Sequence, residues 1–178
     1  MTGNLSLKDW PAANSEYELS ELYRNTDQSN CLVAVRVPLQ YPQTSAYLQA
    51  VFTHNNNGRY FDCQAVMLED SIIGKIETTV YENGIGELDF VLRKEYTGRH
   101  IGRQVLAMYI ERLRTLRICR GLCAYVDLRN QAAGRILLAN GFHGTRRFSA
   151  DVSVPDGNTI RIETRQGMEL QLVFEETV

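Results

Sequence analysis

A chain of 178 residues suffices for one domain, which we expect to span residues 1–178, and such a domain buries its core without disulfides or metals. The formal net charge of −2 excludes a general attraction to nucleic acid or anionic lipid. The N-terminus lacks the basic start and apolar run of a signal peptide, and no apolar stretch approaches the roughly 20 residues that span a bilayer. We therefore expect a cytoplasmic protein with no nucleic-acid or membrane partner.

The N-terminal half predicts two helices and then three strands. Apolar residues recur among acids over residues 15–24, and a second helical pattern over residues 43–54 follows Pro42. The strands are expected at residues 62–68, 72–81 and 85–92.

Asn83-Gly84 lies between the last two of these strands and is a strong hairpin signal. A two-residue loop would place Val80 opposite Glu87 and Thr78 opposite Asp89, whereas a longer loop would shift that register.

The clearest helix is expected at residues 101–118, where apolar residues recur at steps of three and four. A buried strand at 121–128 and a short helix at 131–140, ended by Gly141, follow. The tail, residues 144–176, predicts two or three strands with a turn at residues 155–158. This order indicates a mixed α/β (α+β) sheet, in which an antiparallel meander precedes a strand–helix–strand unit and a C-terminal hairpin. The hairpin is a plausible surface for a homodimer.

The four cysteines, Cys31, Cys63, Cys119 and Cys123, match no common zinc spacing. The three histidines give no signature of a partner for a thiol nucleophile. We predict reduced, mostly buried thiols and no metal site.

The junction between the third strand and the long helix carries the strongest chemical signal. The first turn of a helix has backbone N–H groups without internal partners, at the positive end of the helix dipole. A pyrophosphate binds readily there, and Gly98, Gly102, Arg99 and Arg103 would favour close approach and charge-assisted contacts. The alternative is a plain strand-to-helix turn with solvated arginines. The segment is neither a Walker P-loop nor a good dinucleotide fingerprint.

A second segment follows, in which Asn130 and Ala133 precede Gly141-Phe142. Together with the loop, it resembles the GNAT superfamily of N-acetyltransferases, over roughly residues 60 to 145. Within the superfamily, the chain looks most like the branch of ribosomal-protein N-terminal alanine and serine acetyltransferases. The resemblance implies a GNAT-like single domain with splayed central strands and acetyl-CoA as co-substrate.

Three positions depart from the superfamily pattern. Thr97 stands in place of glutamine or arginine, and His100 stands where the first loop glycine is usual. His100 offers its backbone N–H only if its conformation does not demand glycine. Leu137 replaces a tyrosine that in many relatives protonates the CoA thiolate, so the general acid is unassigned.

The resemblance also implies which residues bind acetyl-CoA. Backbone near Phe90 and Leu92 would pair with the pantetheine arm, and Asn130 would bond it. The amides of the loop would hold the pyrophosphate, and Arg135 would reach the nucleotide or remain a solvated helix arginine. The implied set is Phe90, Leu92, Thr97, Gly98, Arg99, His100, Ile101, Gly102, Arg103, Asn130 and Arg135.

The reaction needs a neutral amine. An α-amine with a pKa near 8 is about one-tenth neutral at pH 7 and needs only a weak base or a water relay. Glu87 and Asp89 are the best candidates for base or amine anchor, and Glu77 on the preceding strand is the third. Solvation or a neighbouring cation is the alternative for each. Tyr96 and Tyr125 flank the expected site, and either is a possible proton donor or a core aromatic.

Three functions remain open at this stage. The first is acetylation of a protein or peptide N-terminal α-amine. The second is acetylation of a small amine, such as a polyamine, an amino acid or an amine-bearing antibiotic. The third is a non-catalytic domain that binds acyl-CoA or a partner protein.

Overall fold

The structure is a computed structural model that describes residues 3–10, 15–26, 32, 60–156 and 159–174. Its described strands form one sheet in the order β1-β2-β3-β4-β5-β7-β6. The elements are β1 (Leu5–Asp9), α1 (Ser15–Arg24), β2 (Tyr60–Leu68), β3 (Ser71–Val80), β4 (Ile85–Leu92), the 3-10 helix η1 (Lys94–Tyr96), α3 (Ile101–Leu116), β5 (Gly121–Asp127), α4 (Gln131–Ala139), β6 (His143–Asp156) and β7 (Thr159–Val173).

The predicted mixed α/β order is confirmed. The meander β2–β3–β4 is antiparallel, β4 and β5 are parallel, and the tail forms two strands, β6 and β7. Strand β1, which pairs with β2, was not predicted. The helix predicted at residues 43–54 lies outside the described residues. None of the described helices has the length and apolar character needed to cross a bilayer.

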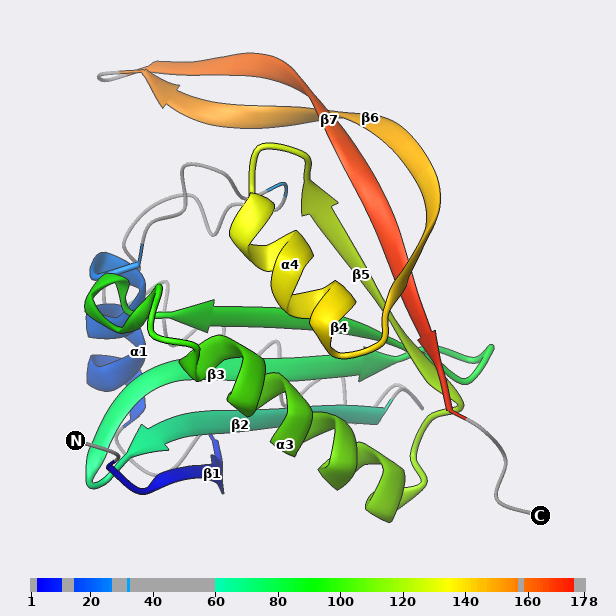
Figure 1. The fold of residues 1–178 in the computed structure, drawn as a ribbon. Coiled ribbons are helices and arrows are strands. Elements are labelled where there is room, and N and C mark those ends of the chain that lie inside the picture. The colour runs from blue at the N-terminus through cyan, green and yellow to red at the C-terminus, as the bar shows by residue number, and fades with distance from the viewer. Residues whose placement is uncertain (1–2, 11–14, 27–31, 33–59, 157–158, 175–178) are drawn as a thin grey trace.

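Helices cover both faces of the sheet. On one face, α3 and α4 lie side by side across the strands (Figure 1), and their buried side chains share one core cluster with Ile76, Leu88 and Leu122. On the other face, Leu19 and Leu22 of α1 pack with Cys63 and other residues of β2 in a second cluster. The two clusters follow from the alternation of side chains along each strand.

The β3–β4 hairpin has the longer loop of the two alternatives, so its register is shifted by one residue from that of a two-residue loop. The structure pairs Val80 with Gly86 and Thr79 with Glu87. The Tyr81 N–H donates a hydrogen bond to the Ile85 carbonyl, so the loop consists of the three residues 82–84 and not of two. This register places Glu77 directly opposite Asp89, on the same face of the sheet.

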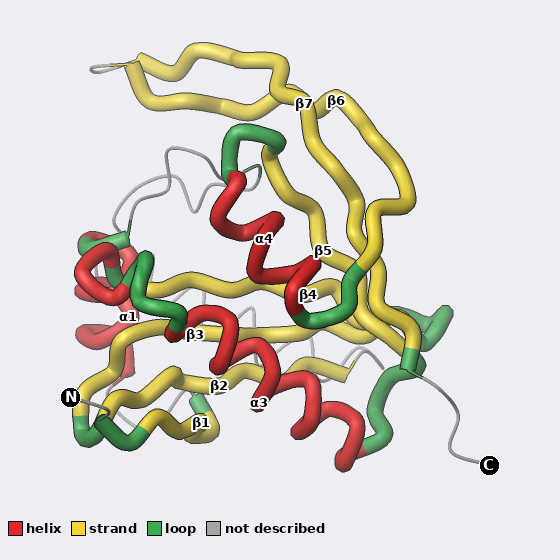
Figure 2. Tube along the Cα trace, in the orientation of Figure 1, coloured by secondary structure: helices red, strands yellow, loops and turns green. Residues whose placement is uncertain are grey.

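The parallel strands β4 and β5 separate soon after they begin. They pair only at Ile85–Gly121, Gly86–Leu122 and Glu87–Cys123. Beyond these pairs β5 follows β7, with which it is paired from Gly121 to Asp127. Figure 2 shows the two backbones diverging toward their C-terminal ends. The predicted splay of the central strands is therefore confirmed.

Helix α4 ends in a way that explains the Gly-Phe pair. Gly141 has a φ of +88°, in the left-handed region that favours glycine. The Phe142 N–H donates to the Leu137 carbonyl at 3.2 Å, and the Phe142 ring is buried in the main core. Glycine thus stops the helix, and phenylalanine fixes the direction in which β6 leaves.

Candidate active site

Where β4 leaves β5, backbone groups of β4 lose their strand partner. The bonds Tyr81 N–H to Ile85 carbonyl and Arg93 N–H to Ile73 carbonyl show that odd-numbered residues of β4 bond to β3. The N–H groups of Phe90 and Leu92 therefore point to the side that β5 has left. The Leu92 carbonyl differs from these N–H groups, because it accepts a 3.4 Å hydrogen bond from the Thr26 hydroxyl. The divergence thus presents the backbone near Phe90 and Leu92 to a ligand lying between the strands.

The loop between β4 and α3 is open. Its residues from Thr97 to His100 are exposed, and Gly98 has a φ of +72° with nothing within 4 Å of where a Cβ would stand. The first turn of α3 carries no acidic residue, and His100 makes no side-chain cap. The unpaired N–H groups of this turn, at the positive end of the helix, suit an anion.

His100 has φ 61° and ψ 1°, a left-handed conformation. The predicted role of His100 required a conformation that does not demand glycine, whereas this conformation is one that favours glycine. Histidine is one of the few side chains that enter this region with any frequency. The loop therefore keeps its shape without the usual glycine, at some cost in backbone strain.

Gly102 differs from Gly98, because it is buried. A Cβ at Gly102 would stand 2.8 Å from Ile136 Cδ1 and 3.4 Å from Phe90 Cε1. Its small size lets the start of α3 pack closely on α4 and β4. The glycine that opens the loop to solvent is Gly98.

Three arginines lie around this loop with their side chains exposed: Arg99, Arg103 and Arg135. The Arg99 guanidinium lies 5.8 Å from the centre of the Tyr96 ring. Tyr96 is half-buried against the main core, as is Ile101, the first residue of α3.

Asn130 begins α4 at the end of β5. Its side-chain oxygen accepts a 3.1 Å hydrogen bond from the Ala133 N–H, which leaves the amide NH₂ for other contacts. An asparagine at this position is therefore explained by its role as a helix N-cap as well as by the predicted contact with a ligand.

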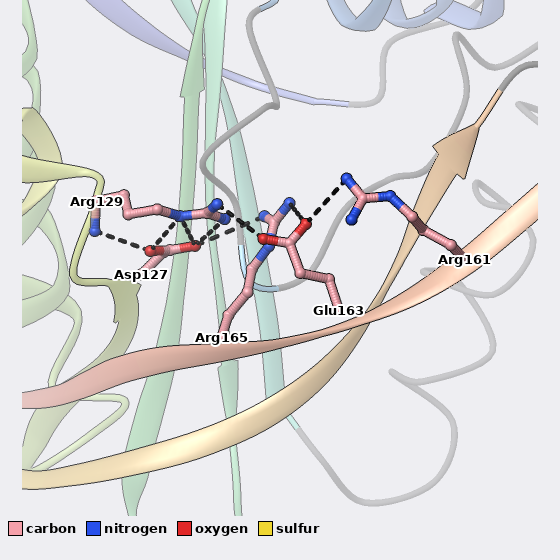
Figure 3. A network of polar contacts seen from close by, with 5 residues as sticks. All are labelled: Asp127, Arg129, Arg161, Glu163 and Arg165. Carbon is pink, nitrogen blue, oxygen red and sulfur yellow. Dashed lines mark hydrogen bonds and ion pairs between the residues drawn. The ribbon is translucent and has the colours of Figure 1, made fainter.

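An ion-pair network holds this end of β5 against β7 (Figure 3). The buried Asp127 carboxylate lies 2.8 Å from Arg129 and 3.6 Å from Arg165, and both arginines also contact Glu163. Burial opposes ionisation of Asp127, but the hydrogen bonds from Arg129 prevail, and the pKa of Asp127 lies below its ordinary value. No residue pattern predicted this network, because Glu163 and Arg165 lie far along the chain from Asp127.

The three candidate acids all lie on the sheet face opposite α3. Glu77 and Asp89 are direct partners across β3 and β4, and Glu87 shares their face two residues before Asp89. Sequence reasoning missed Lys75, which is completely buried on the same face. Its ammonium lies 2.6 Å from Glu77 Oε1 and 3.6 Å from Asp89 Oδ2.

Glu87 stands at the last paired position before β4 and β5 diverge. It is half-buried, and its carboxylate accepts a 2.9 Å hydrogen bond from the Tyr81 hydroxyl. It is therefore oriented, partly open to solvent, and next to the point of divergence.

Tyr125 lies on the same face, two residues beyond Cys123 on β5. The residue is 40% exposed, and its ring meets Phe148 edge to face. Desolvation, with Cys123, Glu169 and Glu87 nearby, raises the pKa of Tyr125 to about 12. Leu137, by contrast, is buried in the main core. Cys63, Cys119 and Cys123 are free thiols whose pKa values are raised by burial.

Solved structures share this architecture. Spermidine N-acetyltransferase from Vibrio cholerae, solved with CoA and spermine, has a TM-score of 0.75 at 13% identity over 95% of each chain. An acetyltransferase from Salmonella typhimurium that modifies the N-terminal serine of a 50S ribosomal subunit protein gives 0.76 at 13% identity, over 98% of this chain and 97% of that one. Ribosomal-protein-alanine N-acetyltransferase from Brucella melitensis gives 0.73 at 16% identity, over 95% and 99%. A search of curated protein sequences finds no match.

A mixed sheet whose central parallel strands diverge beside an open helix start has the fold of these acetyltransferases. The sequence itself matches the family model of the acetyltransferase (GNAT) domain over residues 7–143. The chain belongs to the GNAT acetyltransferase family.

Proposed function

We propose that this acetyltransferase moves an acetyl group from acetyl-CoA to a primary amine, with a protein or peptide N-terminal α-amine as the leading acceptor. The observation that carries the proposal is the divergence of β4 and β5 beside the exposed start of α3, with carboxylates on the opposite face. The donor is assigned to the α3 face and the acceptor to the face of Glu87 and Asp89.

The residues around the start of α3 fit the pyrophosphate of acetyl-CoA. The N–H groups from Gly98 to Gly102 supply donors, and Arg99 and Arg103 supply positive charge. The open space at Gly98 and the lack of an acid in the first turn of α3 support this fit. Phe90 and Leu92 offer N–H groups to the pantetheine arm, and we assign the side-chain NH₂ of Asn130 to the same ligand. Arg135 is assigned to its nucleotide end.

On the acceptor side, we assign Glu87 as the base, acting directly or through a water. Asp89, whose side chain is 56% exposed, anchors the amine. Glu77 is only 13% exposed and forms the close ion pair with Lys75, so we assign it to that lysine instead of the acceptor. A weak base suffices, since an α-amine with a pKa near 8 is already about one-tenth neutral at pH 7.

Tyr125 is a poor candidate for the acid that protonates the departing thiolate. Its pKa is raised to about 12, whereas a thiol has a pKa near 8.5, so the proton transfer would run uphill. We assign the hydroxyl to hydrogen bonding in the acceptor site. The proton that the attacking amine releases is a simpler source for protonating the departing thiolate.

The structures of the two ribosomal-protein acetyltransferases support the protein N-terminus as acceptor. The spermidine enzyme supports a polyamine as the second candidate, and the carboxylates of the acceptor face suit its cationic groups. Both candidates use the same donor site and differ only in what occupies the acceptor face.

Two measurements test the function. Acetyl-CoA at millimolar concentration should raise the melting temperature, because a ligand that binds only the folded state stabilises it. Thiol release should then be measured against N-terminal alanine and serine peptides and against spermidine. Release with the peptides supports the leading acceptor, and release with spermidine alone moves the assignment to a polyamine. No thermal shift and no release would refute the proposed reaction.

The assignment of the base has its own test. Glu87→Gln should lower kcat/KM by about 10²–10⁴-fold, the usual contribution of a general base. Glu82→Gln, at an exposed residue of the neighbouring β3–β4 loop, is the matched control and should leave kcat/KM unchanged. Full turnover of Glu87→Gln would rule out this role.

A further inference from the structure

Lys75 is the most deeply buried charged residue among the described residues of the sheet. It has no exposed surface, and it projects from β3 between the sheet and α1. Its ammonium lies 5.6 Å from the centre of the Tyr23 ring of α1. A buried cation is tolerated only when it is paired, and here two carboxylates share it.

The two carboxylates that share Lys75 differ in exposure. Glu77 lies at 2.6 Å from the ammonium and is 13% exposed, whereas Asp89 lies at 3.6 Å and is 56% exposed. Lys75 and Glu77 thus form a buried pair behind a carboxylate that opens to solvent. The cluster carries one negative charge more than positive when both acids are ionised, and that charge lies on the solvent side.

The other titratable groups near this cluster, among the described residues, are Tyr23 from α1, Cys63 from β2 and Glu87, which lies two residues before Asp89 on the same face of β4. Burial raises the pKa of Tyr23 to about 12 and also raises that of Cys63. Tyr23 and Cys63 are therefore neutral near pH 7. Among the described residues, Lys75 and Glu77 are the charged groups that shift the pKa of Asp89.

We propose that Lys75 is a positioning residue of the acceptor site, which holds the Asp89 carboxylate ionised and oriented toward the acceptor amine while Glu77 balances its charge. This inference rests on the proposed function, in which Asp89 anchors the amine. The lysine does not touch the acceptor, because the acid that it holds stands between it and solvent.

The electrostatics of Asp89 support this role. Although the Asp89 side chain is 56% exposed, its pKa lies above the ordinary value, because desolvation raises it more than Lys75 lowers it, and Glu77 raises it again. Removing Lys75 should therefore raise the pKa of Asp89, so that the anchor is protonated at a higher pH. Removing the charge of Glu77 should lower that pKa, because Lys75 then serves Asp89 alone.

The test compares Lys75→Met with Glu77→Gln. Both variants break the same ion pair, the first by removing the cation and the second by removing the charge of the carboxylate. For each variant, kcat/KM is divided by the wild-type value from about pH 5.5 to about pH 8.5, with the acceptor identified by thiol release. The ratio cancels the titration of the amine substrate, whose pKa is the same in every measurement.

We expect opposite slopes. The ratio for Lys75→Met should fall as the pH falls, by about tenfold for each unit that the pKa of Asp89 rises. The ratio for Glu77→Gln should rise as the pH falls, because the anchor then stays ionised to a lower pH than in the wild type. Structural damage alone would lower both ratios by the same factor at every pH. Should Lys75→Met fail to fold, the Glu77→Gln profile decides alone: a ratio that rises as the pH falls supports the proposal, and a ratio that is flat or falls contradicts it.

Asp89→Asn separates this inference from the proposed function. Its kcat/KM should be low near pH 8 and approach the wild-type value at low pH, where the wild-type anchor is protonated as well. An impaired Asp89→Asn with pH-independent ratios for both Lys75→Met and Glu77→Gln would leave the anchor in place and reduce Lys75 to a structural residue. A fully active Asp89→Asn would remove the anchor and this inference with it. A wild-type protein that releases no thiol with any acceptor would instead remove the proposed function.

Discussion

Single residues in the loop before α3 and in the segment from Asn130 to Phe142 carry both the family pattern and its exceptions. Gly141 and Phe142 match the pattern for a physical reason, since one adopts a positive φ and the other fills the core. His100 departs from the pattern but adopts the backbone conformation that glycine would have. The sequence shows which residue types occupy these positions, whereas the strain at His100 becomes visible only from its φ angle.

His100→Gly should stabilise the fold. A left-handed conformation costs an L-residue about 1–2 kcal/mol, and the greater chain entropy of glycine returns about 0.5–1 kcal/mol of this, so a net gain of about 0.5–1 kcal/mol is expected. His100→Ala keeps the strain and should give no gain. The free energy of unfolding from urea titration compares the two variants. Equal stabilities would show that residue 100 is unstrained.

At the scale of elements, the helices and central strands followed local patterns that the sequence displays directly. The bounds of β4 agree with the predicted residues 85–92, and α3 ends two residues earlier than the predicted residue 118. The register of the β3–β4 hairpin stayed open at the sequence level because loop length depends on backbone bonds and not on the Asn-Gly pair alone. Strand β1 was missed because its period-two pattern covers only Leu5 and Leu7, and its pairing is with the distant strand β2.

The two glycines of α3 and α4 should respond differently to alanine. Gly134 lies in α4 with open space around it, so Gly134→Ala should add about 0.5–1 kcal/mol through helix propensity. At Gly102 the new methyl group would meet Ile136 at 2.8 Å, and the overpacking should cost about 1–3 kcal/mol. Thermal unfolding of both variants measures the contrast. A gain at Gly102 equal to that at Gly134 would contradict the close packing of α3 on α4.

At the scale of the whole molecule, the divergence of two strands organises the site. Strand β5 leaves β4 because β7 pairs with its entire length, and the network around Asp127 fixes the end of β5 to that strand. The sheet then presents the start of α3 on one face and the carboxylates of Glu87 and Asp89 on the other. Under the proposed function, a donor and an acceptor that approach from opposite faces would meet where the strands part.

Asp127→Asn should weaken this arrangement in a pH-dependent way. The folded pKa of Asp127 is depressed, so its contribution is present above the unfolded pKa near 3.9 and is lost as the pH falls through the folded pKa. We expect a loss of about 1.5–3 kcal/mol near pH 7, because the charged hydrogen bonds from Arg129 weaken and Arg165 loses the Asp127 carboxylate, and a shrinking difference below about pH 4. Urea unfolding at several pH values measures it. Asp70→Asn, in the exposed turn before β3, is the control and should change little.

By itself, the sequence determined the order of the elements from β2 onward, the glycine-containing loop before α3 and the family resemblance, because helical periods, glycines and capping residues act over a few neighbouring positions. Only the tertiary structure decided that β4 and β5 part after Glu87, that Glu77 faces Asp89, and that Lys75 lies buried between their carboxylates. These features depend on strand pairing and burial between segments that are distant in the chain, and residue spacing along one segment does not encode them.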